Sequence, residues 1–87
     1  MASSVIDKPR GFGKAELDGC GHIIETDEGK RYCSSSMNLK YVLSTFNGYA
    51  KDRHDHNMIL KQKDDYGRER PIAKSVLGRV SLLILFY

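Results

Sequence analysis

The fold depends first on the stretch HIIETDEGKRYCS, residues 22–34, which has the local features of a β-hairpin. Two runs of strand-forming residues flank the tripeptide Asp-Glu-Gly at 27–29, which fits a three-residue loop with glycine in the left-handed position. That loop sets a register in which Glu25 lies opposite Arg31. An opposite-charge cross-strand pair stabilises a hairpin by roughly 0.2–1 kcal/mol, so the loop length and this side-chain pair favour the same register.

The hairpin raises the question of the two cysteines, Cys20 and Cys33. A bridge between them closes a loop of about 14 residues and stabilises the fold by roughly 3 kcal/mol. Side chains alternate along a strand, however, so the expected register puts the two thiols on opposite faces. Only a bend at Gly19 or Gly21 brings them together. A disulfide and two partly buried free thiols therefore both remain open, and free thiols are the plainer interpretation.

One short helix is expected after the hairpin, near residues 37–46. A serine before Met37 is a suitable N-cap, and the Asn-Gly pair at 47–48 is a suitable end, because both residues tolerate the left-handed conformation. Four apolar residues recur with the spacing of one helical face. They are Leu39, Val42, Leu43 and Phe46.

The second half of the chain predicts further strands. MILKQK at 58–63 reads as a strand, and 64–71 reads as a turn region because proline does not fit a central strand. The C-terminal segment is either strand or helix. We expect one or two helical turns after Pro71 and a buried strand from Arg79. The predicted class is thus α+β, with a small antiparallel sheet that includes the 22–34 hairpin.

Length and composition predict a single small domain over residues 1–87, with residues 1–11 as a flexible start. Of its residues, 40% are hydrophobic and 29% are charged, which is typical of a globular protein. A chain this short has a modest core, so we expect its stability to depend on a partner or a cross-link. No secretory leader is recognisable and no apolar run is long enough to span a bilayer. The expected setting is soluble and intracellular.

The cysteines and histidines suggest zinc as an alternative to a protein without a cofactor. Zinc binds four nitrogen or sulfur ligands in tetrahedral geometry. Every cysteine and histidine belongs to the candidate set, although its spacing matches none of the familiar zinc motifs. The candidate ligands are Cys20, His22, Cys33, His54 and His56.

The net charge of +3 comes wholly from residues 44–87, which makes nucleic acid a possible partner. Acidic residues interleave with the bases, and that mixture also fits a solvated polar surface. Tyr49 and Tyr66 are the candidate stacking side chains. The candidate basic surface consists of Lys51, Arg53, Lys61, Lys63, Arg68 and Arg70.

No catalytic motif is present, since no cysteine, histidine or carboxylate sits in a recognisable nucleophile–base pattern. We therefore expect a non-enzymatic binding or assembly protein, partner-dependent or a subunit of a larger complex. The apolar end of the chain is the expected protein interface. It comprises Val80, Leu82, Leu83, Ile84, Leu85 and Phe86.

Residues 15–50 resemble one repeat of the cyanovirin-N homology family. The matching pieces are Leu17-Asp18-Gly19, Gly29, Ser35-Ser36, Met37-Asn38-Leu39 and Asn47-Gly48, with two cysteines spaced as in that family's bridged pair. The resemblance implies a β-rich lectin that binds high-mannose glycans without a cofactor. A glycan is therefore an alternative partner.

Overall fold

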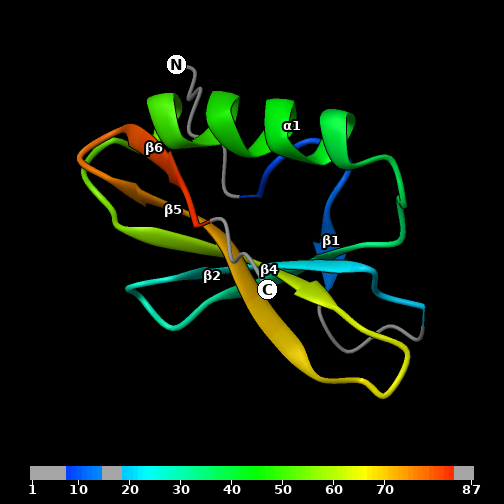
Figure 1. The fold of residues 1–87 in the computed structure, drawn as a ribbon. Coiled ribbons are helices and arrows are strands. Elements are labelled where there is room, and N and C mark those ends of the chain that lie inside the picture. The colour runs from blue at the N-terminus through cyan, green and yellow to red at the C-terminus, as the bar shows by residue number, and fades with distance from the viewer. Residues whose placement is uncertain (1–7, 15–18, 84–87) are drawn as a thin grey trace.

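The computed structural model describes residues 8–14 and 19–83, and shows one helix above a strongly twisted antiparallel sheet (Figure 1). The elements in chain order are β1 (Gly13–Lys14), β2 (His22–Thr26), β3 (Arg31–Ser34), α1 (Leu39–Asp52), β4 (Met58–Lys63), β5 (Glu69–Val76) and β6 (Arg79–Leu82). Their order across the sheet is β1-β3-β2-β4-β5-β6. The predicted α+β class with a small antiparallel sheet is confirmed.

The β2–β3 hairpin has the expected loop and register. Glu25 pairs with Arg31, and the backbone N–H of Thr26 donates to the carbonyl of Lys30 at 2.9 Å. Gly29 closes the loop with φ of 85°. On its other side β2 pairs with β4, so the hairpin lies within the sheet rather than at an edge.

The helix begins and ends later than expected. Asn38 is the N-cap, and its side-chain oxygen accepts from the N–H of Tyr41 at 3.1 Å. The serine cap was thus wrong. The helix also continues past the Asn-Gly pair at 47–48, because Tyr49 and Ala50 are buried against the sheet. Burial of these two side chains overrides the local stop signal.

The core lies between the helix and one face of the sheet, hereafter the covered face. Side chains from four neighbouring strands form the sheet side of the core, and side chains from the helix pack against them. On the sheet these residues include Ile24, Tyr32, Leu60 and Ala73, and on the helix Val42, Phe46, Tyr49 and Ala50. Tyr32 and Tyr49 meet edge to face, with ring centroids 6.1 Å apart.

Residues 69–82 form a hairpin, so the helical turns expected after Pro71 were wrong. Pro71 is tolerated because the β4–β5 register shifts there, with Ile72 as the extra residue of a bulge. The turn after β5 has Leu77 at φ 52° and Gly78 at φ 80°, which is a type I′ turn. A strand does begin at Arg79 as expected, but β6 is an edge strand with mostly exposed side chains rather than a buried one.

At the start of the chain, only part of the expected flexible segment is described. Residues 1–7 lie outside the described residues. Pro9 is buried, and its carbonyl accepts from the N–H of Phe12 at 3.1 Å. The first strand, β1, is described as Gly13–Lys14.

Candidate functional site

The face of the sheet that the helix leaves uncovered, hereafter the open face, carries the candidate site. Partners across the sheet share a face, so the register places Glu25, Arg31 and Lys61 here, opposite the core. Three features follow one another across this face. They are a buried disulfide at one end, a group of four charges in the middle and an apolar groove at the other end.

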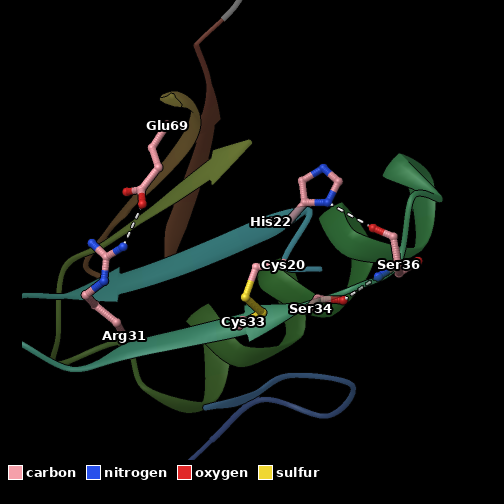
Figure 2. Close-up of a disulfide and its surroundings, with 7 residues drawn as sticks. All are labelled: Cys20, His22, Arg31, Cys33, Ser34, Ser36 and Glu69. Carbon is pink, nitrogen blue, oxygen red and sulfur yellow. Dashed lines mark hydrogen bonds and ion pairs between the residues drawn. A yellow bond between two sulfur atoms is a disulfide. The ribbon is translucent and has the colours of Figure 1, made fainter. Parts of the chain in front are cut away.

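The disulfide joins Cys20 to Cys33, with Cα atoms 5.5 Å apart (Figure 2). Free thiols on opposite faces were therefore the wrong expectation. The alternation is broken between Cys20 and β2, because Cys20 is buried together with Ile23 and Cys33 rather than on the face of His22. Gly19, directly before it, adopts φ of 83°. Gly21 lies in a close approach, since a Cβ there would lie 3.1 Å from the sulfur of Met37.

His22 lies beside the disulfide but points to the covered side of the sheet, where it is fully buried (Figure 2). Its Nδ1 lies 3.0 Å from the carbonyl of Ser36, and its Nε2 lies 3.4 Å from the side-chain nitrogen of Gln62. A carbonyl only accepts, so Nδ1 carries the proton and Nε2 accepts from Gln62. Burial lowers the pKa of His22, and the hydrogen bond to Ser36 offsets this only in part.

Four charged residues, one from each of four neighbouring strands, form the centre of the open face. We call Glu25, Arg31, Lys61 and Glu69 the charge quartet. Arg31 binds the carboxylates of both Glu25 and Glu69, the latter at 2.8 Å. Lys61 lies 2.8 Å from Glu25 and 3.9 Å from Glu69. Each carboxylate thus touches both cations, and the four charges close into a ring.

The ring favours the ionised form of Glu25. The hydrogen bond from Lys61 lowers the pKa of Glu25, and Arg31 adds to this effect, against a partial opposing effect of burial. In turn, the hydrogen bond to Glu69 raises the pKa of Arg31. A carboxylate whose pKa is lowered is a poor proton donor near neutral pH, so Glu25 is not suited to act as a general acid.

The groove lies beyond the quartet, where β2, β4 and β5 approach the turns. Its volume is about 250 Å³, and its exposed wall is almost entirely apolar. Ile59 and Val76 supply exposed apolar surface on the open face, with Met58 also lining the groove. Glu25 and Lys74 are among the charged residues that border it. The groove therefore combines an apolar centre with a charged margin.

The candidate basic residues are not brought together. Lys61 belongs to the quartet, whereas Lys51 lies in the last turn of the helix. Arg53 contacts Glu28 at 3.3 Å, and Arg70 pairs with Gln62 on the covered face. Lys63 ends β4 and pairs with Glu69.

The two tyrosines expected to stack on bases differ sharply. Tyr49 is buried in the core, while Tyr66 is 83% exposed. The guanidinium of Arg68 lies 5.1 Å from the centre of the Tyr66 ring and 2.8 Å from Asp64. A phosphate-tracking stripe is not favoured by this arrangement.

The five candidate zinc ligands are also separated. Cys20 and Cys33 are joined to each other, and His22 lies at the opposite end of β2 from the loop that holds His54 and His56. His56 instead contacts Asp27 at 3.2 Å and Asp55 at 3.3 Å. Within residues 8–14 and 19–83, no group of three or more histidine, cysteine or acidic side chains is arranged to hold a metal ion.

The expected C-terminal interface is described in part. Val80 packs against the core, Leu83 is half-buried, and Leu82 is 55% exposed. Residues 84–86 of that set lie outside the described residues.

Comparison with known proteins assigns no relative. No protein-family model matches the chain, and neither a curated protein nor a solved structure matches it. The resemblance of residues 15–50 to a lectin repeat therefore stays a prediction. Among the described residues, no helix is long and apolar enough to cross a membrane.

Sequence reasoning found half of the quartet and missed the groove. Glu25 and Arg31 were recognisable as a local hairpin pair. Lys61 and Glu69 join them from strands that no local pattern connects to the hairpin. The groove needed the β4–β5 register, and its only sequence signal was an apolar residue at a solvent position, Ile59.

Proposed function

We propose that this protein is a non-enzymatic binding protein that engages a protein partner through the open face of its sheet, as a component of a larger assembly. The main observation in support is the groove, in which Ile59 and Val76 are exposed beside the charge quartet. Protein interfaces commonly have an apolar centre within a polar rim, which is the pattern here.

The size of the groove supports a protein partner over a small molecule. Small-molecule sites are typically concave pockets of about 300–1,000 Å³ that enclose their ligand. The groove measures about 250 Å³ and is open to solvent along the open face. A side chain or short loop of a partner fits such a groove, with Lys74 and Glu25 available at its margin for charged groups.

The titratable groups support a role without catalysis. The carboxylates of the quartet are each paired with two cations. The buried histidine, His22, uses both ring nitrogens to hold Ser36 and Gln62. Catalytic groups need a proton acceptor or donor within reach of substrate, and these groups are already engaged with the protein itself.

The disulfide also bears on the compartment in which the protein works. The sequence predicts an intracellular protein, and this remains a prediction. The bridge between Cys20 and Cys33 argues for an oxidising environment, because disulfides persist there and are rare in reducing compartments. The intact mass of the unreduced protein tests whether the bridge is present, since a bridged chain weighs two hydrogens less than a chain with free thiols.

Site-specific photo-crosslinking in the producing organism tests the proposal. A photoreactive residue at Val76 should yield a discrete protein adduct. The same residue at Ser44, which is exposed on the helix, should not. Adducts at both positions, or at neither, contradict the open face as the binding surface.

Once a partner is in hand, Val76→Asp should weaken binding at least tenfold, which corresponds to about 1.4 kcal/mol. The matched control is Tyr66→Asp, because Tyr66 is even more exposed but lies away from the groove. Equal binding by Val76→Asp and the unaltered protein contradicts the proposed site.

A further inference from the structure

The edge of the sheet at β6 is a second surface, distinct from the groove. In the part of the chain that the structure describes, β6 pairs with β5 on one side and with no strand on the other. It carries Leu82, which is 55% exposed. An unpaired edge with apolar side chains is a template for pairing with another strand.

The hydrogen-bond pattern shows which groups this edge presents. The N–H of Leu83 donates to the carbonyl of Ile72 at 2.8 Å. Hydrogen-bonded pairs recur at every second residue of an antiparallel ladder. Residues 79, 81 and 83 therefore bond to β5, and the N–H and C=O groups of Val80 and Leu82 point outward.

We propose that β6 pairs antiparallel with β6 of a second copy of this chain, with Ser81 of the two copies facing each other on a two-fold axis. In this register Val80 of each copy lies opposite Leu82 of the other. Those are the two outward-facing residues, so the copies exchange four backbone hydrogen bonds. Centring the pair on Val80 or Leu82 instead leaves one outward residue without an outward partner in β6.

The side chains fit the same register. Val80 and Leu82 both belong to the covered face, since they pair with Ser75 and Ala73. Apolar side chains thus meet apolar side chains from the other copy, which favours pairing. The segment Val-Ser-Leu reads apolar–polar–apolar in either direction, and this favours a second copy over an unrelated strand.

The charges do not oppose the pairing. Arg79 lies opposite Leu83 of the other copy, and its own counterpart is four residues away along the strand, about 13 Å. This exceeds the screening length of about 8 Å at physiological salt. A two-fold axis perpendicular to the sheet keeps both helices on one side and joins the two open faces into one surface.

Cysteine cross-linking of the full chain tests this register. Facing residues in a non-hydrogen-bonded antiparallel pair have Cα atoms about 4.5 Å apart, within the range of a disulfide. Ser81→Cys should therefore form a covalent dimer on mild oxidation. Arg79→Cys, on the same strand and also exposed, should stay monomeric. Absence of the Ser81→Cys dimer, or equal dimer formation by both variants, overturns the proposal.

Sedimentation equilibrium keeps the inference falsifiable without new cysteines. The unaltered protein should shift from monomer toward dimer as concentration rises. Leu82→Lys should remove this shift, because lysine on an edge strand opposes pairing. Leu77→Lys is the control, since Leu77 is 72% exposed in the turn but off the edge. A dimer that persists in Leu82→Lys, or a strictly monomeric unaltered protein, contradicts the pairing. The photo-crosslinks at the groove are unaffected by either outcome.

Discussion

The two faces of the sheet are built from the same strands but differ in the environment of their side chains. On the covered face, side chains such as Ile24 and Leu60 are fully buried under the helix. On the open face, their neighbours in sequence, Glu25 and Lys61, form a charge ring in water. One residue along a strand therefore separates a position in the core from one on the partly exposed open face.

This difference separates the residues that stabilise the fold from those that we propose to bind a partner. Apolar burial contributes about 25 cal/mol per Å² removed from water, whereas exposed ion pairs contribute about 1 kcal/mol or less. Substitutions on the covered face should consequently affect stability, and those on the open face should affect binding. The disulfide is the exception, because it stabilises the fold from the open side.

The largest effect is expected for Phe46→Ala on the covered face. Phe46 is completely buried in the core, and removing such a ring costs about 3–5 kcal/mol. In a domain this small that loss is a large part of the total stability. Urea unfolding measures it, with Tyr66→Ala as the exposed control that should change stability by less than about 0.5 kcal/mol. Equal losses in the two variants would mean that the helix does not cover the core.

Removal of the disulfide should have the next largest effect. Cys20→Ala combined with Cys33→Ala should lower the free energy of unfolding by about 3 kcal/mol, because the open chain gains entropy when unfolded. Urea unfolding under non-reducing conditions measures the change. The unaltered protein in reductant should match the double variant. A double variant as stable as the oxidised protein contradicts the bridge.

The third prediction concerns pH and the covered face. The folded-state pKa of His22 is lowered, so the unfolded state binds more protons as pH falls through about 6.5. Stability should therefore be full above about pH 6.5 and decrease below it. His22→Gln should flatten this dependence in urea titrations between pH 7.5 and pH 5, while His54→Gln should retain it. Parallel curves for His22→Gln and the unaltered protein would exclude His22 as the cause.

The smallest effect is expected on the open face. Arg31→Gln should cost at most about 1 kcal/mol at neutral pH, because the quartet is partly exposed and screened by salt. The lowered pKa of Glu25 gives stability that is present above about pH 4.5 and lost as pH falls through its folded-state pKa. The difference from the unaltered protein should thus shrink at acidic pH. Lys51→Gln serves as the control on the helix, and a larger loss at low pH than at neutral pH contradicts the assignment.

Local features of the fold were predictable from sequence, and non-local ones were not. The β2–β3 hairpin was correct because its loop and its cross-strand pairs lie within 13 residues of chain. The helix end was wrong because the stop signal at 47–48 is local, whereas the burial of Tyr49 depends on the sheet. The face of Cys20 was likewise wrong, because strict alternation does not extend from β2 back through Gly21 to Cys20.

The bulge makes residues 71–76 hard to recognise as a strand from the sequence. Ile72 and Ala73 are consecutive, yet both pack against the core. A bulge puts two neighbours on one side of a strand and breaks the period of two that identifies strands. The assembled site was unpredictable for a similar reason, since Glu69 reaches Arg31 only through the β4–β5 register.

The bulge also has a consequence for how the length of this chain can vary in descent. Loss of one residue elsewhere in β5, such as Lys74, would move the side chains of part of the strand to the opposite face of the sheet. Loss of Ile72 would not, because Pro71 and Ala73 already pair with the adjacent residues Lys61 and Leu60. Only the packing and the carbonyl bond of Ile72 would disappear. Position 72 is thus a point within β5 where one residue can be lost while both faces of the sheet stay as they are.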